Sequence, residues 1–163
     1  MNERTVGVIG LGAMGLGIAR TLRQRGYRVR ACDARAGVAA AFAAEGGVAC
    51  TTPAEVANGV RVVVSVVVNA AQTEQVLFGS DGAAAAMAPG SVFVMCSTVD
   101  PNWSMALEAR LAQQGILYVD APISGGAARA ASGEMTMMTA ATPAAYAAAG
   151  DVLQAMASKV YRL

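Results

Sequence analysis

The chain contains no histidine, and Lys159 is its only lysine. Without histidine, we expect neither a zinc site with imidazole ligands nor a histidine-based catalytic site. The three cysteines are odd in number and match no metal-binding spacing, so we expect no metal site, reduced thiols and a cytoplasmic protein. These cysteines are Cys32, Cys50 and Cys96.

Charged residues are scarce as well, at 14% of the chain, and the formal net charge is only +1. Nothing in this balance favours binding to nucleic acid or to an anionic membrane surface. The very apolar run 60–68 is about half as long as a membrane span and contains Arg61, so we expect a buried strand there. Because the first apolar run begins within about five residues of Met1 and follows Glu3, we expect no signal peptide.

The chain is instead rich in small apolar residues, with 55% hydrophobic and only 5% aromatic residues. This composition is typical of a buried parallel sheet flanked by helices. Apolar runs alternate with helical patterns, which predicts βαβ units. Because crossovers between parallel strands are right-handed, we expect residues 1–163 to form one Rossmann-type domain of the α/β class. Its doubly wound, mostly parallel sheet has helices on both faces and its ligand at the carboxyl ends of the strands.

Strands are predicted near residues 5–9, 28–32, 60–68, 91–95 and 117–119, with weaker ones near 135–139 and 159–161. Helices are predicted near residues 14–24, 38–45, 53–57, 73–78, 101–114 and 143–156, with a short one near 83–86. Three helices begin with a capping residue followed by proline, at Thr52, Asp100 and Thr142. Glycine marks three expected helix ends, at Gly26, Gly46 and Gly115.

A glycine-rich turn lies between the first predicted strand and the first predicted helix. Three glycines at G-x-G-x-x-G spacing in this context are the fingerprint of a dinucleotide-binding site. The first glycine makes the tight turn, the second lets a pyrophosphate approach, and the third lets the helix pack close to the strand. Free N–H groups at the helix start then bind the anion. The predicted cofactor-binding residues of this turn are Gly10, Leu11, Gly12, Ala13, Met14 and Gly15.

An acidic residue, Asp33, closes the second predicted strand. A carboxylate at this place accepts hydrogen bonds from the adenosine ribose hydroxyls and repels a 2′-phosphate, which favours NAD over NADP. Arg35 instead favours NADP, since an arginine beside the ribose is a feature of NADP sites. An alternative for Asp33 is that it only caps the next helix.

Two further segments follow predicted strands: residues 96–101 (CSTVDP) and 120–126 (DAPISGG). Together with the opening glycine turn, they resemble the β-hydroxyacid dehydrogenases. That family includes 3-hydroxyisobutyrate, threonate and 6-phosphogluconate dehydrogenases and tartronate semialdehyde reductases. The resemblance extends over nearly the whole chain, and residues 133–136 (GEMT) favour the hydroxyisobutyrate and threonate branch.

The resemblance implies that Thr98 contacts the nicotinamide side of the cofactor. It also implies contacts from Val67, Val68 and Gln72, in the turn after the run 60–68. Relatives usually have Leu-Pro where this chain has Val67-Val68, so these two contacts are expected through backbone atoms. The alternative for Thr98 is a cap of the helix at Pro101.

Ser124, Gly125 and Gly126 are the residues that the resemblance assigns to the substrate carboxylate. Consecutive N–H groups in a glycine-rich turn form a concave anion site, and the serine adds a hydroxyl donor. The alternative is that Ser124, Gly125 and Gly126 form only a tight turn after a strand and bind no ligand. Asp120 is expected to order the adjacent loop rather than to transfer protons. No basic group is evident near Ser124, which disfavours a phosphorylated sugar acid.

The family's general base is a lysine on a long helix beyond this domain, so we expect the catalytic lysine after residue 163. Lys159 lacks the family's surrounding motif and is interpreted as a solvated strand residue. The resemblance also implies a C-terminal helical domain, absent from these residues, that closes the cleft and forms a homo-oligomer. Residues 1–163 are therefore expected to bind NAD weakly, to be inactive, and to expose an apolar patch.

The expected function is the cofactor-binding half of an NAD-dependent dehydrogenase for a small β-hydroxy carboxylate such as 3-hydroxyisobutyrate or threonate. The alternatives are a tartronate semialdehyde reductase and a non-catalytic NAD-sensing module. An imine-reducing relative is disfavoured, because the Ser-Gly-Gly turn suits a carboxylate.

Overall fold

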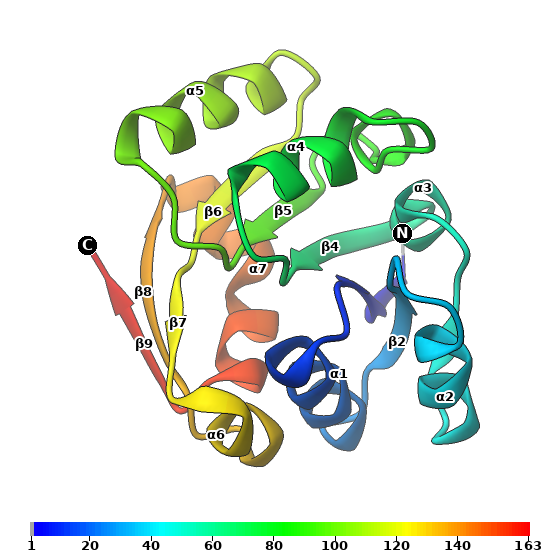
Figure 1. Ribbon diagram of the computed structural model, residues 1–163. Coiled ribbons are helices and arrows are strands. Elements are labelled where there is room, and N and C mark those ends of the chain that lie inside the picture. Colours follow the sequence, from blue (N-terminus) through cyan, green and yellow to red (C-terminus); the bar gives the residue numbers. More distant parts are fainter. Residues whose placement is uncertain (1) are drawn as a thin grey trace.

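The computed structural model describes residues 2–163, with side chains from Arg4 onward. Helices cover both faces of a central sheet (Figure 1). The strands are β1 (Asn2–Ile9), β2 (Arg28–Cys32), β3 (Val48–Ala49), β4 (Val60–Ser65), β5 (Val92–Met95), β6 (Leu117–Asp120), β7 (Ile123–Ser124), β8 (Thr136–Ala141) and β9 (Lys159–Arg162). The helices are α1 (Ala13–Gln24), α2 (Val38–Ala44), α3 (Pro53–Ala57), α4 (Ala70–Phe78), α5 (Pro101–Ala112), α6 (Gly126–Ser132) and α7 (Pro143–Met156), with a 3-10 turn, η1, at Ala84–Ala86.

The sheet is parallel over most of its width. Strands β3, β2, β1, β4, β5 and β6 lie side by side in that order, all parallel. Strand β8 then pairs antiparallel with both β6 and β7, and β9 pairs parallel with β8. Thr136 and Met137 of β8 pair with β7 and also with β9, so these two strands lie on opposite edges of β8. The predicted doubly wound, mostly parallel Rossmann-type sheet is confirmed.

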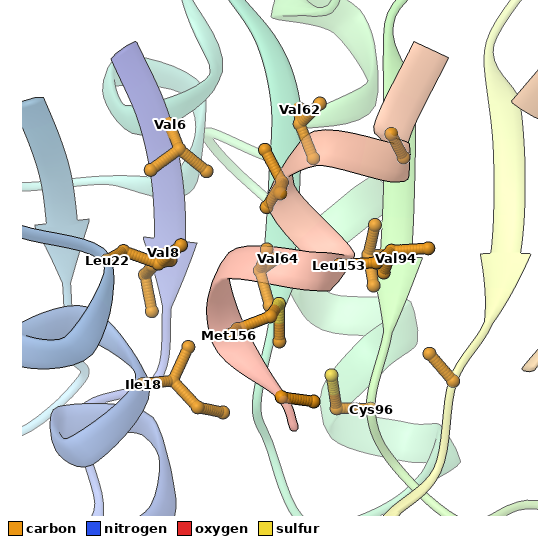
Figure 2. Packing of buried hydrophobic residues seen from close by; sticks show 14 of the residues in the cluster. Val6, Val8, Ile18, Leu22, Val62, Val64, Val94, Cys96, Leu153 and Met156 are labelled. Atoms are coloured by element: carbon orange, nitrogen blue, oxygen red, sulfur yellow. The ribbon is translucent and has the colours of Figure 1, made fainter. Parts of the chain in front are cut away.

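Two apolar clusters, one on each face, hold the layers together. Alternate residues of a strand point to opposite faces, so Val62 and Val64 enter one cluster and Val63 enters the other. The first cluster packs the sheet against α1 and α7, and Figure 2 shows Ile18 and Leu153 from these helices facing the strand valines. The second cluster packs the sheet against α3, α4 and α5. Burial on both faces explains why the strands are apolar throughout.

Three predicted helix starts are confirmed at their caps, whereas α4 begins at Ala70 rather than near residue 73. The side chains of Thr52, Asp100 and Thr142 accept hydrogen bonds from N–H groups in the first turns of α3, α5 and α7. Gly26, which follows α1, has a φ of 95°, a left-handed conformation that glycine adopts without strain. Capping chemistry is local, which is why the sequence predicts it well.

Several predicted elements differ from the observed ones. Strand β4 ends at Ser65 rather than at residue 68, because Asn69 caps α4 by accepting a hydrogen bond from the Gln72 N–H at 2.9 Å. The short helix expected at 83–86 is only the 3-10 turn η1. The sequence did not predict β3, β7 or α6. Within residues 2–163, no helix combines the length and apolarity that a membrane crossing requires.

Candidate cofactor and substrate site

The glycine turn after β1 is fixed by two close backbone approaches. Gly10 has a φ of 96°, and a Cβ there would collide with the carbonyl oxygen of Val66. A Cβ at Gly15 would collide with the carbonyl oxygen of Gly10. Both glycines are therefore required by the fold itself.

Gly12 differs from its two neighbours in the motif. Its φ is −66°, which any residue adopts, and a Cβ there would meet no atom within 4 Å. Gly12 is the N-cap of α1, and no side chain caps that helix. The space above Gly12 and the uncapped N–H groups at the start of α1 fit the pyrophosphate of a dinucleotide. The fold does not require this glycine, whereas a bound pyrophosphate would.

Leu11 contacts the rest of the site through its backbone. Its side chain is buried, and its N–H donates a hydrogen bond of 2.7 Å to Oδ2 of Asp33. This bond joins the glycine turn to the end of β2. Ala13 is exposed and Met14 half-buried in the first turn of α1.

Asp33 is held by Arg35 as well as by Leu11. The backbone N–H of Arg35 donates to Oδ1 at 2.9 Å, and its guanidinium contacts both carboxylate oxygens at 3.0 and 3.2 Å. Partial burial alone would raise the pKa of Asp33, but the hydrogen bonds from Arg35 and Leu11 outweigh it and lower that pKa to about 2. The alternative of a helix cap is wrong, because Gly37 is the N-cap of α2.

The loop after β4 lies directly against the glycine turn. The carbonyl oxygen of Ile9 accepts a hydrogen bond of 2.8 Å from the Val66 N–H. A Cβ on Gly10 would lie 3.3 Å from Cγ1 of Val67. Val68 is exposed, and its N–H donates to Oε1 of Gln72 at 2.7 Å. Gln72 therefore fixes the loop from the first turn of α4, with its side-chain oxygen already engaged.

The loop after β5 is joined to the loop after β4 by Ser97. Its hydroxyl donates a 2.6 Å hydrogen bond to the carbonyl oxygen of Val67. Ser97 was not predicted as part of the site, since a serine in a loop carries no signal of a contact 30 residues away. Thr98 is exposed beside it. Thr98 is not the cap of α5 as the alternative supposed, because Asp100 has that role.

The turn at Ser124, Gly125 and Gly126 joins β7 to α6. Gly125 and Gly126 have φ values of 128° and 74°, so only glycine fits both positions without strain. All three residues are exposed. The turn has the bare, accessible backbone that an anion-binding site needs.

Helix α6 packs closely on α1 and so holds this turn near the glycine turn. A Cβ at Gly17 would lie 2.7 Å from the backbone nitrogen of Ala131, and the Thr21 hydroxyl donates to the carbonyl oxygen of Ala130 at 2.8 Å. Gly17 lies four residues and Thr21 eight residues after the start of α1, and their partners Ala130 and Ala131 lie four and five residues after the start of α6. Figure 1 shows β7 leading to α6, which lies beside α1.

The other titratable candidates differ in exposure and in pKa. Lys159 is exposed on β9, as the sequence predicts. Asp120 is half-buried at the end of β6, and burial raises its pKa. Burial also raises the pKa of Cys32 and Cys96 to about 12, so neither thiol ionises readily. Among the side chains of residues 4–163 there is no cluster of metal-ligating groups.

Comparison with known families identifies the group to which this arrangement belongs. Residues 5–163 match the NAD binding domain of 6-phosphogluconate dehydrogenase. The chain belongs to this family. The chain is thus an NAD-binding domain, and its glycine turn, apolar strands and Ser-Gly-Gly turn all lie within the matched residues.

Dehydrogenases are among the proteins similar to this NAD-binding domain. L-threonate dehydrogenase of Cupriavidus necator is 58% identical over 161 residues, covering 99% of this chain and 54% of that protein. The crystal structure of 3-hydroxyisobutyrate dehydrogenase from Salmonella typhimurium has a TM-score of 0.92 at 42% identity, covering 97% of this chain and 55% of that one. Psf3, solved in complex with NADP+ and 2-OPP, has a TM-score of 0.89 at 27% identity, covering 97% of this chain and 56% of that one. The NAD-binding domain spans about half the length of these relatives.

Proposed function

We propose that residues 1–163 hold the cofactor and the substrate carboxylate of an NAD-dependent dehydrogenase. The substrate class is a small β-hydroxy carboxylate resembling threonate or 3-hydroxyisobutyrate. One observation carries the proposal: the turns after β1 and β7 lie at the starts of two packed helices, and no side chain caps either helix start. The names of the similar dehydrogenases support the substrate class.

Each part of the site has a separate role in this proposal. N–H groups at Gly12, Ala13 and Met14 bind the pyrophosphate, while Asp33 accepts hydrogen bonds from the adenosine ribose. The backbone at Val67 and Val68, with Gln72 behind it, and the Thr98 side chain flank the nicotinamide. NAD, when bound, supplies the hydride acceptor. The proposed carboxylate site consists of Ser124, Gly125 and Gly126.

Asp33 favours NAD over NADP, because a carboxylate repels a 2′-phosphate. Each carboxylate oxygen of Asp33 already accepts two hydrogen bonds, so a ribose hydroxyl can bind only by replacing one of these donors. The donor replaced is the Arg35 side chain, because Arg35 is the more exposed residue of the Asp33–Arg35 ion pair. We therefore expect Arg35 to turn outward when NAD binds.

Oxidation of a hydroxy acid also needs a general base for the hydroxyl proton. Residues 1–163 offer neither histidine nor a lysine at the site. We propose that the base is a lysine outside these residues, and that a helical domain carrying it also forms the oligomer. This division predicts binding without turnover for residues 1–163.

The experiment that tests the proposal compares Gly12→Ala with the unchanged chain. Because a methyl group at Gly12 meets no protein atom, the fold should be unaffected, while NAD affinity should fall on the order of tenfold. Isothermal titration calorimetry measures the affinity, and Trp103 fluorescence gives a second signal. The matched control is Gly150→Ala in α7, whose added Cβ also meets nothing within 4 Å. Equal NAD affinity in all three proteins would refute the proposed cofactor site.

A further inference from the structure

We propose that Arg129 is a substrate-binding residue that pairs with the carboxylate held at Ser124, Gly125 and Gly126. This inference rests on the proposed function. The prediction that no basic group lies near Ser124 is wrong, because Arg129 lies there. Arg129 is five residues away in the sequence, yet its side chain lies against the turn.

The geometry that carries the proposal is the approach of Arg129 to Gly125. A Cβ built on Gly125 would lie 3.0 Å from both Cβ and Cδ of Arg129. Side chains on a helix lean toward its N-terminus, so an arginine in the second half of α6 runs back along the preceding turn. The guanidinium carbon is two bonds beyond Cδ and therefore remains close to the bare backbone of Gly125. Glycine at this position leaves room for that stem.

The charge of Arg129 is not neutralised by the protein. Arg20, Arg35 and Arg110 are each paired with a carboxylate at 2.7 to 3.0 Å. In the part of the chain that the structure describes, no such pair includes Arg129, and its side chain is exposed. A ligand carboxylate bound by the turn would thus meet a planar, permanently charged donor beside it. Such a pair selects a free acid over a neutral ester or amide.

A plain surface arginine is the competing explanation. Arg129 lies in the last turn of α6, where a positive charge stabilises the helix dipole. That role predicts an effect on stability and none on ligand binding. A substitution that removes the positive charge of Arg129 but keeps an aliphatic side chain against Gly125 distinguishes the two explanations.

The test is an NMR titration of the chain with NAD present, following the backbone N–H signals of the Ser124–Gly126 turn. The ligands are 3-hydroxyisobutyrate and its neutral methyl ester. Arg129→Met should weaken binding of the acid about tenfold and leave the ester and NAD affinities unchanged. Arg129→Lys should restore binding to within roughly threefold, since the charge returns without the planar fork. The control is Arg110→Met, at the opposite face of the sheet, which should bind the acid as the unchanged chain does.

Equal acid affinity in Arg129→Met and the unchanged chain would overturn the role of Arg129 and leave the carboxylate site standing. A failure of the acid to shift the turn signals in the unchanged chain would overturn both. Loss of NAD affinity in Arg129→Met would also count against the proposal, because it would show damage beyond the carboxylate.

Discussion

At the scale of single residues, Asp33 both stabilises the fold and supplies the carboxylate that we propose binds the adenosine ribose. Its carboxylate ties the glycine turn to the end of β2 through Leu11, and it forms an ion pair with Arg35. The bonds that stabilise the ionised form are present before any ligand arrives. The same carboxylate therefore contributes to stability in a way that depends on pH.

Asp33→Asn should lower the free energy of unfolding by roughly 1 kcal/mol at neutral pH. The expected loss is this small because Arg35 is exposed and solvent screens its ion pair with Asp33. The folded pKa of Asp33, about 2, is below its ordinary value of 3.8. The stabilisation is thus fully present above the unfolded pKa and is lost as pH falls through the folded pKa. Urea unfolding should show the difference between variant and unchanged chain shrinking below about pH 4. Gly150→Ala in α7, which changes no titratable group, is the control and should show no such trend.

Residues differ in how far the sequence predicts them. The glycine turn and Asp33 were found because their spacing along the chain carries the signal. Ser97 and Arg129 were not, because their importance depends on contacts with Val67 and Gly125 that spacing does not encode. The roles assigned to Thr98 and Ser124 remain predictions.

At the scale of elements, the contact between α1 and α6 determines where the proposed carboxylate turn lies. The contact uses Gly17, whose missing side chain lets the two backbones approach. The sequence did not predict α6, since its seven residues carry no apolar periodicity and it is held by α1. Likewise, β3 and β7 have two residues each and exist only through pairing with β2 and β8. Longer elements, buried on a whole face, were predicted correctly.

Gly17→Ala should destabilise the protein by roughly 1–3 kcal/mol, because the new methyl group forces α6 away from α1. Thermal or urea unfolding measures this change. Gly150→Ala makes the same substitution in a helix with open space, and should instead stabilise by roughly 0.5–1 kcal/mol. A stabilising Gly17→Ala would contradict the close packing of the two helices.

At the scale of the whole molecule, the parallel strands bring the turns after β1, β4 and β5 to one edge of the sheet. The fold class followed from the alternation of patterns and from the right-handed crossover rule, whereas the order of the strands in the sheet was not predicted. The antiparallel reversal at β8 was not predicted, because strand direction at a sheet edge depends on long-range pairing.

The protein comprising residues 1–163 should bind NAD without oxidising 3-hydroxyisobutyrate or threonate. The reason is that its only lysine lies on β9 and it has no histidine to accept the hydroxyl proton. Absorbance of NADH measures turnover, and calorimetry with NAD on the same sample confirms that the protein is competent to bind. Sustained NADH formation would show that the chain supplies its own base.

Self-association should appear at high concentration through β9, which among the described strands pairs only with β8, and through the exposed side chains beside it. Met138, Tyr161 and Leu163 are 43%, 48% and 80% exposed there, and an unpaired strand edge adds free backbone groups. Sedimentation velocity should show the effect, and Tyr161→Lys should reduce it. Met105→Lys, which removes an exposed side chain on α5, should leave it unchanged.

The hydrogen bond from Ser97 to Val67 has a consequence for how a ligand is received. Since one hydroxyl joins two neighbouring loops, they form a single preorganised wall rather than two flaps that must be ordered separately. The loss of loop freedom has already occurred during folding, so a nicotinamide bound as proposed would meet an ordered surface and its affinity would not be reduced by that entropy.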